Sequence, residues 1–436
     1  MADARAADLG RELHSLVTEL YPICRSITGD GVRRTLEILG RIAPLEVHEV
    51  PSGIPVHDWT VPNEWNVRDA WIKDGGGKRV VDFREHNLHV LNYSVPVHRR
   101  VSREELDGHL HSLPEHPDWI PYRTSYYAEA WGFCLTQRQR DGLLDDEYEV
   151  CIDSSLEPGH LTYGEVVVPG EVADEVLVST HVCHPSLCND NLSAIAVAIR
   201  LASERLERPG RYTHRFLFIP GTIGSITWLA RNPEAASRVR HGLTLQCLGD
   251  TSPFTYKRTF AGSAEIDRVA AAVLARRAEG HSLIDFFPYG YDERQFNSPG
   301  YRLAVGALMR GRHGQFPEYH TSADDPAFVR AEALAESHGV VREILWTLDA
   351  NRRFRNLAPY GEPQLGKRGI YRAMGGANDP AELQMAMLWT LNMMDGDHSL
   401  LDVTERSGIA FETIERAAAM LEEHDLLEAV PTRQES

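Results

Sequence analysis

Between residues 160 and 350 the sequence alternates between short apolar runs and longer amphipathic ones, and this rhythm limits the possible folds more than any other feature. The short runs are typical of buried strands: "EVLVSTH", "HRFLFIP", "GLTLQCLGD" and "YRLAVGALMR". Helices are predicted over 191–207, 264–279 and 329–350. Strands that alternate with helices form a mostly parallel sheet with helices on its faces. We therefore predict an α/β fold with a mostly parallel (mixed) sheet flanked by helices.

Two other regions differ in texture from this core. Residues 63–153 are rich in Trp and Tyr and alternate in short bursts, as in "RVVDFREHNLHVLNYSVPVHRRVS", which predicts a β-rich inserted domain. Beyond Pro359 the pattern is helix, turn at Gly408, helix and short strand, with Asp379 as the expected N-cap of the first helix. This is the outline of a C-terminal winged helix. The predicted domains are a core of residues 1–62 and 154–358, an insertion of residues 63–153, and a winged helix of residues 359–436.

The charge balance makes nucleic acids and anionic membranes poor partners. The chain has 45 basic and 63 acidic residues, a net charge of −18. Between residues 378 and 430, twelve acidic residues face only two basic ones, Arg406 and Arg416, which leaves a net charge of −10. Because DNA affinity depends on Lys and Arg neutralising phosphates, the winged helix is expected to serve packing or homo-oligomer formation and not DNA binding.

The sequence also indicates where the protein resides. No apolar run approaches the roughly 18 residues of a transmembrane helix. The N-terminal "MADARAADLGRELHSLV" carries charges where a signal peptide needs an apolar core. We expect a cytoplasmic protein whose six cysteines stay reduced.

Four metal-binding side chains follow predicted strands. His181 ends the first strand, Asp190 precedes the helix after it, Asp250 follows "LTLQCLG", and His320 lies in the loop beyond "YRLAVGALMR". Asp190 alone could simply cap a helix, but the carboxyl ends of parallel strands meet at one edge of a sheet, so these four can converge. Two imidazoles and two carboxylates suit zinc, with water completing its coordination. The sequence predicts a zinc site of His181, Asp190, Asp250 and His320.

The cysteines of "HVCHPSLCNDN" are rival ligands. Cys183 and Cys188 lie close together, but no second cysteine pair follows within reach, so a structural four-cysteine zinc site is not expected. We expect Cys183 to line the site or to pack beneath it. His184, which precedes Pro185, has the ordinary alternative of a turn residue.

Five segments, in order, carry a family resemblance: "STHVCHPSLCNDNLSA", "FLFIPGTIGSI", "LGD", "DERQFNSPG" and "EYHTSADD". They resemble the M28-type zinc aminopeptidase fold and, more closely, the aminopeptidase-like family known as DUF4910. The insertion ("PNEWNVRDAWIKD", "LPEHPDWIPYRTSYY", "WGFCL") resembles the DUF2172 segment of that family, and the C-terminal region resembles its winged helix. The resemblance covers nearly the whole chain.

The resemblance implies roles for the four predicted ligands. In M28 peptidases two zinc ions share an aspartate; one ion also has a histidine and an acidic residue, and the other has a glutamate and a histidine. Asp190 corresponds to the shared aspartate, His181 and Asp250 to ligands of the first ion, and His320 to a ligand of the second. Cys183 stands where many M28 enzymes carry an aspartate.

The chain departs from the M28 pattern at Pro220-Gly221-Thr222. M28 peptidases have two adjacent glutamates here, one a zinc ligand and one the general base. The missing ligand implies one zinc ion per chain. The missing base leaves the proton transfers of amide hydrolysis unassigned. The candidates are Asp292, Glu293 and His184, although "DERQ" could also be a solvated salt bridge in a loop.

These observations lead to one principal function and two alternatives. The principal one is a zinc-dependent hydrolase that acts on an amide bond of a small amine-bearing molecule, a small-molecule or short peptide-like substrate. Acidic and aromatic groups of the 63–153 insertion would help to shape its pocket. The alternatives are a zinc-dependent non-hydrolytic enzyme of a biosynthetic pathway, catalysing acyl transfer or elimination, and a catalytically inactive aminopeptidase-like scaffold.

Overall fold

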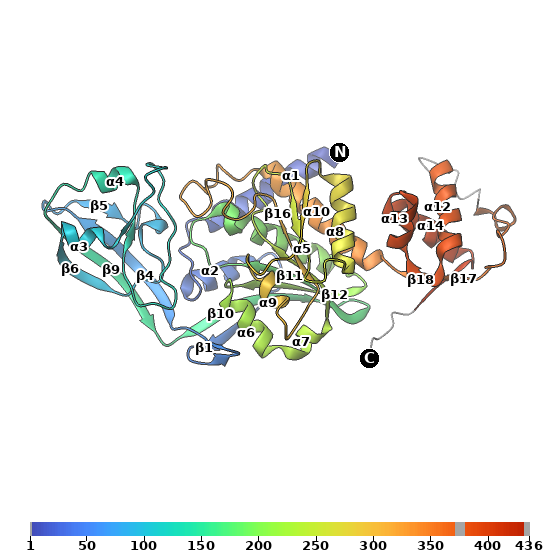
Figure 1. The fold of residues 1–436 in the computed structure, drawn as a ribbon, viewed down its shortest axis with the longest axis horizontal. Coiled ribbons are helices and arrows are strands. Elements are labelled where there is room, and N and C mark those ends of the chain that lie inside the picture. The colour runs from blue at the N-terminus through green and yellow to red at the C-terminus, as the bar shows by residue number, and fades with distance from the viewer. Residues whose placement is uncertain (1, 371–379, 431–436) are drawn as a thin grey trace. The chain divides into compact units, whose positions relative to one another are not determined.

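The structure is a computed structural model that describes residues 2–370 and 380–430 (Figure 1). Its contacts divide the chain into two compact units, Met1–Arg342 and Glu343–Ser436. Among the described residues, no helix combines the length and the apolar character that crossing a membrane requires.

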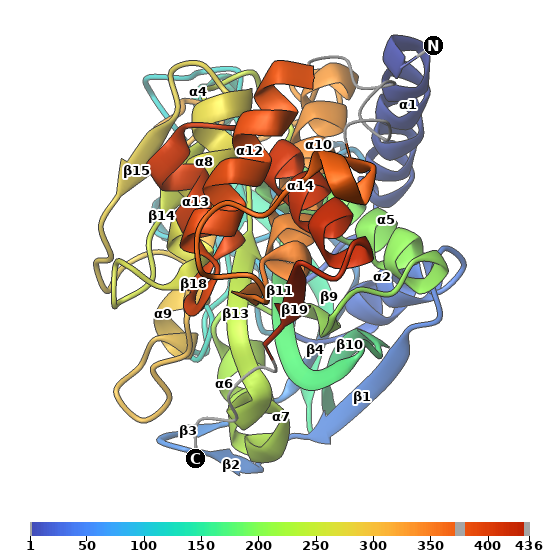
Figure 2. The same ribbon diagram turned by 90° about the vertical axis from the view of Figure 1, so that its right-hand side faces the viewer.

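An eight-stranded sheet forms the centre of the first unit, in the order β1-β10-β12-β11-β13-β16-β14-β15. In Figure 2 it extends from β1 on one side to β14 and β15 on the other. The four central strands run parallel: β12 (Tyr212–Ile219), β11 (Val172–His181), β13 (Val239–Leu245) and β16 (Val305–Met309). The outer strands make the sheet mixed: β1 (Glu46–Pro51), β10 (His160–Val168) and β14 (Thr255–Lys257) each pair antiparallel with the strand on their inner side, whereas β15 (Ser282–Ile284) pairs parallel with β14. The predicted α/β fold is confirmed.

Helices cover this sheet because the central strands are apolar on both faces. Helix α5 lies against β10, β11 and β12 and also against α1, while α8 contacts β13 and β16. In α5 every residue from Ala194 to Ile199 is buried. The α-helices of this unit outside the insertion are α1 (Ala2–Leu20), α2 (Asp30–Leu39), α5 (Ala194–Glu207), α6 (Ile223–Arg231), α7 (Pro233–Arg238), α8 (Glu265–Arg277) and α9 (Glu293–Phe296), and α10 (Ala331–Ala350) continues into the second unit.

The strand order creates a switch point at the carboxyl end of β11. The chain passes from β11 to β12 on one side and later returns to β13 on the other. Open α/β sheets bind their ligands in the crevice outside such a point. His181, the last residue of β11, lies at this end of the sheet.

The insertion contains an antiparallel sheet of four strands in the order β5-β4-β9-β6. Strand β9 continues to Glu157, beyond the predicted end of the insertion at residue 153. The elements between β1 and β10 are β2 (Pro55–Val56), β3 (Trp59–Thr60), β4 (Glu64–Lys73), β5 (Arg79–Asp82), η1 (Asn87–His89), β6 (Val97–Ser102), α3 (Arg103–Asp107), β7 (Leu110–His111), β8 (Phe133–Cys134), α4 (Gln137–Asp141) and β9 (Glu147–Glu157).

The second unit has the winged-helix order of elements. Gly408 adopts φ +73° directly after α13, which explains the glycine at the predicted turn. Asp379, the expected N-cap, lies outside the described residues. Three strands form its sheet, in the order β18-β17-β19. Beyond α10, the elements in the part of this unit that the structure describes are β17 (Arg353–Asn356), η3 (Gly366–Arg368), α12 (Pro380–Met393), β18 (Asp395–Ser399), α13 (Leu400–Ser407), α14 (Phe411–Glu423) and β19 (Leu427–Ala429).

Candidate metal centre

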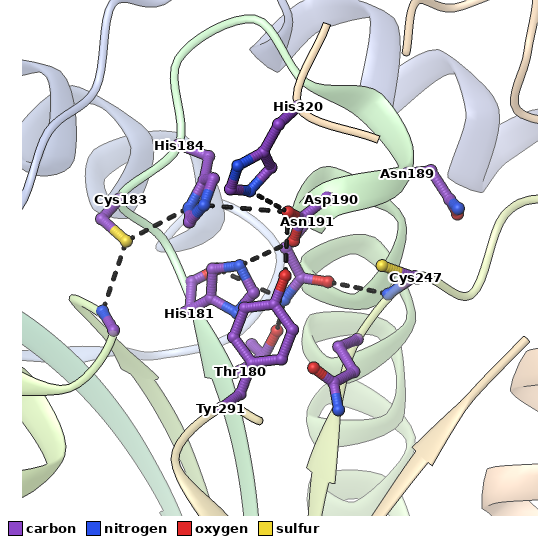
Figure 3. A network of polar contacts seen from close by, with 12 residues as sticks. Thr180, His181, Cys183, His184, Asn189, Asp190, Asn191, Cys247, Tyr291 and His320 are labelled. Atoms are coloured by element: carbon purple, nitrogen blue, oxygen red, sulfur yellow. Dashed lines mark hydrogen bonds and ion pairs between the residues drawn. The ribbon is translucent and has the colours of Figure 1, made fainter. Parts of the chain in front are cut away.

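Three histidines surround the carboxylate of Asp190 at the carboxyl end of β11 (Figure 3). The Nε2 atom of His181 lies 2.9 Å from Asp190 Oδ1, and the Nε2 atom of His320 lies 3.0 Å from Asp190 Oδ2. The Nε2 atom of His184 lies 3.7 Å from the same Oδ2 atom. The structure therefore brings together three of the four predicted ligands, and it adds His184 to them.

Asp190 is an anion in this setting although its side chain is fully buried. Burial acts to raise its pKa, but the neighbouring His184 and the hydrogen bonds from His181 and His320 outweigh burial and hold the pKa well below the usual value. The hydroxyl of Tyr291 donates a further hydrogen bond of 2.9 Å to Asp190 Oδ2. The carboxylate is thus surrounded by groups that favour its charged form.

The donor set fits a zinc ion. Ligand atoms of His181, His184 and Asp190 all lie within 4.8 Å of one another. Burial lowers the pKa of His184 well below its usual value, and the neighbouring His181 and His320 act in the same direction. Neutral imidazoles and a carboxylate are the ligands of catalytic zinc sites.

Backbone and side-chain contacts fix the turn that carries Asp190. The buried carboxylate of Asp324 accepts hydrogen bonds from the backbone N–H groups of Asn189 (2.5 Å) and Asp190 (2.9 Å). Burial raises the pKa of Asp324 to about 8. The side-chain amide of Asn191 donates to Thr180 Oγ1 at 2.7 Å, and its oxygen accepts from the N–H group of Cys247 at 3.1 Å. Such supporting contacts hold metal ligands in place.

Asp250, the fourth predicted ligand, points elsewhere. Its Oδ2 atom accepts hydrogen bonds from the side chain of Asn189 (2.8 Å) and from the N–H group of Gly311 (3.1 Å). Its Oδ1 atom accepts from the N–H group of Ser252 at 2.6 Å. Asp250 therefore supports the turn that carries Asp190, and the structure does not bring its carboxylate to the three histidines.

The two acidic residues considered as general bases are both engaged. Glu293 is fully buried and pairs with Lys257, whose Nζ atom lies 2.8 Å from its Oε1 atom. This ion pair is buried and not solvated. The Oδ1 atom of Asp292 accepts hydrogen bonds from the N–H group of Thr222 (2.7 Å) and from Ser225 Oγ (2.9 Å), while burial raises the pKa of Asp292. Asp292 therefore anchors the segment that follows Gly221.

Gly221 leaves room for a side chain beside the centre. A Cβ atom added there would lie 3.5 Å from Cys183 Sγ and 3.8 Å from His181 Cβ, which are ordinary contact distances. Its φ angle lies outside the left-handed region that favours glycine. Its N–H group donates to Cys183 Sγ at 3.3 Å, and the same sulfur lies 3.3 Å from His184 Nδ1. Cys183 thus packs between the glycine and the histidine.

Tyrosine rings enclose the histidines, and sequence reasoning did not identify them. The ring of Tyr291 stacks on His181 with centroids 4.5 Å apart, and that of Tyr319 stacks on His320 at 3.9 Å. The two hydroxyls are 2.8 Å apart. The sequence signal was the aromatic residue beside each candidate motif, in "YGYDER" and "EYHTSADD".

A segment of the insertion also reaches the centre. The N–H group of Tyr122 donates to the carbonyl of His320 at 2.7 Å, and Ile120 and Ser322 exchange two further hydrogen bonds. Residues 120–122 and 320–322 therefore lie side by side. This pairing fixes the backbone of the loop that carries His320.

Similar proteins are known for almost the full length of the chain. The family model described as a domain of unknown function (DUF4910) matches residues 14–351, and a winged helix-turn-helix model matches residues 352–429. A protein of Clostridium acetobutylicum is 50% identical over 425 residues, 98% of each sequence. Its name refers to polysaccharide biosynthesis and to an aminopeptidase-like domain.

Solved structures agree with this match. A crystal structure from Clostridium acetobutylicum, whose name refers to a peptidase, is 48% identical with a TM-score of 0.93 over 98% of each chain. A zinc aminopeptidase from Bacillus subtilis has a TM-score of 0.58 at 11% identity, over 78% of this chain and 95% of its own. A peptidase M28 precursor from Shewanella amazonensis has a TM-score of 0.52 at 14% identity, over 79% and 96%. The last two similarities establish the zinc-aminopeptidase fold of the larger part of the chain.

Proposed function

The chain belongs to the DUF4910 family, and on that premise we propose that it is a zinc-dependent hydrolase of the aminopeptidase-like class that acts on an amide bond of a small amine-bearing molecule. The observation that carries the proposal is the cluster of His181, His184 and His320 around the buried carboxylate of Asp190. It lies at the switch point of the sheet, where α/β enzymes bind their ligands.

His181, Asp190 and His320 are the proposed ligands of one zinc ion per chain. His184, although its ligand atom lies within 4.8 Å of those of His181 and Asp190, is assigned the proton transfer instead. Three protein ligands leave a coordination position open, as in catalytic zinc sites. When bound, zinc would polarise a carbonyl group and lower the pKa of water. Asp250 would position the turn that carries Asp190, because its carboxylate accepts a 2.8 Å hydrogen bond from the side chain of Asn189.

His184 is the proposed group that handles protons. Glu293 forms an ion pair with Lys257, and Asp292 accepts a hydrogen bond from the N–H group of Thr222. The imidazole of His184 instead lies beside Asp190, with its Nδ1 atom on Cys183 and its Nε2 atom towards the carboxylate. A ring nitrogen in this place can take up a proton and return it to a leaving amine.

Gly221 is the observation that favours the second candidate, a non-hydrolytic zinc enzyme. Metal-assisted hydrolysis of an amide needs a base, which commonly contributes about 10²–10⁴-fold to the rate. The end of β12 carries no carboxylate at this residue. Acyl transfer or elimination at a polarised carbonyl could proceed without that group.

Metal content and turnover test the proposal together. Purified protein should contain about one zinc ion per chain by mass spectrometry, because its donor set is that of a single catalytic site. His181→Ala and Asp190→Ala should lose most of it, while Asp8→Ala, at an exposed aspartate of α1, should keep it as the acidic control. Full retention of zinc in both His181→Ala and Asp190→Ala would contradict the site.

The same preparations separate the candidate functions. Wild-type protein and His184→Ala are compared on a panel of aminoacyl amides and N-acylated amines. We expect His184→Ala to keep its zinc and to lose hydrolysis. Zinc-loaded wild-type protein that hydrolyses none of these compounds would favour the non-hydrolytic enzyme, and metal-free protein would favour the scaffold.

A further inference from the structure

Aromatic side chains form a continuous row from the metal centre to the surface. The ring centroid of Tyr122 lies 5.1 Å from that of His184 and 5.0 Å from that of His320. Its hydroxyl is 2.7 Å from the hydroxyl of Tyr126. The rings of Tyr126 and Tyr127 are 6.2 Å apart, and the ring of Tyr127 contacts that of Trp59 at 5.3 Å. We call Tyr122, Tyr126, Tyr127 and Trp59 the aromatic row.

The two outer residues of the row are exposed, whereas the two inner ones are not. Tyr122 is buried at 4% exposure and Tyr126 is half-buried, whereas Trp59 is 39% and Tyr127 52% exposed. Large aromatic rings that meet on a surface leave apolar area in water, and such patches commonly mark interaction sites. The inner end of the row touches two histidines of the metal centre. The row therefore connects the proposed reaction site to an exposed aromatic patch through successive side-chain contacts.

The backbone places the hairpin that carries the outer end of the row against helix α6. Trp59 belongs to the hairpin of β2 and β3. Strand β2 contacts helix α6, which begins two residues after Gly221. In the turn of the same hairpin, the Nε2 atom of His57 lies 2.7 Å from the hydroxyl of Tyr301. Hydrogen-bonding groups thus border the exposed rings.

Three buried carboxylates near the metal centre are engaged by protein groups. Asp190 is held by histidines and a phenol, Asp292 by Thr222 and Ser225, and Glu293 by Lys257. The N-terminus of a peptide carries an ammonium group, which is best recognised by an uncompensated carboxylate. Rings and hydroxyls instead suit a neutral ligand with an apolar face and hydroxyl groups.

A sugar ring has these properties. One face of a pyranose carries C–H groups that pack on aromatic rings, and its hydroxyls exchange hydrogen bonds with phenols and imidazoles. An N-acylated amino sugar also carries an amide bond. The name of the relative from Clostridium acetobutylicum, which refers to polysaccharide biosynthesis, is consistent with a saccharide ligand.

We propose that the aromatic row is a saccharide-binding subsite, with Trp59 and Tyr127 as its outer platform, and that the substrate of the metal centre is an N-acylated amino sugar or a molecule that carries one. The identity of the cleaved bond rests on the proposed function. The binding of sugar by the row does not.

Binding of di-N-acetylchitobiose, measured by isothermal titration calorimetry on the full chain, tests the subsite. Trp59→Ala and Tyr127→Ala should each weaken binding about tenfold or more, a loss of about 1.4 kcal/mol, because each removes a stacking ring. Trp59→Phe should keep most of the affinity. Trp346→Ala is the matched control, because Trp346 is a similarly exposed tryptophan (43%) on α10.

Three outcomes would overturn the proposal. The first is that the wild type does not bind the sugar at about 10 mM, which means a binding free energy weaker than about −3 kcal/mol. The second is that all four variants bind the sugar equally well. The third is that the wild type binds trialanine amide more tightly than the sugar. His181→Ala separates this proposal from the proposed function. If zinc and hydrolysis are absent but sugar binding still depends on Trp59, the proposed function fails and the subsite stands.

Discussion

Placing a carboxylate at residue 221 is the sharpest test of how this centre differs from a peptidase. In Gly221→Glu the new Cβ atom would meet only Cys183 Sγ at 3.5 Å and His181 Cβ at 3.8 Å. The backbone there is open to any residue, and loss of glycine flexibility in the unfolded chain stabilises proteins by about 0.4–1 kcal/mol. We expect the unfolding free energy to change by less than ~1 kcal/mol, a shift in Tm of about 2–4 °C.

The effect on hydrolysis should be far larger than the effect on stability. A correctly placed general base contributes about 10²–10⁴-fold, equivalent to about 3–5 kcal/mol of barrier. Gly221→Glu should therefore raise the hydrolysis of simple aminoacyl amides by at least about tenfold, even if the carboxylate is imperfectly placed. Gly221→Gln is the matched control, since it adds the same volume without a base.

The assay follows release of amine from a panel of aminoacyl amides, with zinc content and Tm measured on the same samples. Rapid hydrolysis by the wild type that Gly221→Glu leaves unchanged would refute the reasoning, because it would show that the proposed base His184 already supplies the full effect of a general base at this centre. His184→Ala would then be the next variant. A Gly221→Glu protein that loses its fold or its zinc would show that the space beside Cys183 and His181 is not available.

Three further results are expected. Glu64 accepts two 2.7 Å hydrogen bonds from Arg33, which lower the pKa of Glu64 to about 2. A folded-state pKa below the unfolded value of 4.5 stabilises the protein above that pH, so Glu64→Gln should lower the free energy of unfolding in urea by about 1–3 kcal/mol at pH 7. This difference should vanish as the pH falls from 4.5 towards 2. Lys257→Met should lower the free energy of unfolding by about 3–5 kcal/mol, because it leaves the buried Glu293 unpaired, and the double variant Lys257→Met/Glu293→Leu should recover much of this loss. Equal stability of the wild type and Lys257→Met would disprove the ion pair. The acidic stretch 378–430 predicts that the protein does not shift duplex DNA even at low salt, and a salt-sensitive shift would contradict this.

The α/β architecture could be predicted because its signal is periodic. The four central strands are apolar on both faces, and this produces continuous runs that sequence reasoning recognises. The three-residue strands β14 and β15 at the edge produce no such run. The winged helix was recognised from helix spacing and from the glycine that its turn requires.

The metal centre could be predicted only in part, because strand periodicity does not determine where a loop side chain points. His181 ends its strand, so its place at the carboxyl edge follows from the sheet. Asp250 lies five residues beyond the end of β13 at Leu245, and the turn directs its carboxylate to Asn189 and Gly311. His184 is likewise placed by its loop. The aromatic residues from the insertion depend on tertiary contacts that no local pattern encodes.

The pairing of residues 120–122 with residues 320–322 has a consequence for the order of folding. Ile120 and Ser322 are 202 residues apart in the sequence, and this contact can form only after the strands between them have been synthesised. Contacts of such long range are costly in loop-closure entropy and form late. The insertion leaves the ribosome long before the loop that it holds, so the loop of His320 acquires its final shape after the sheet has assembled. A shortened chain without residues 63–153 would lack the segment that pairs with the loop of His320, and it would be a poor minimal version of the protein.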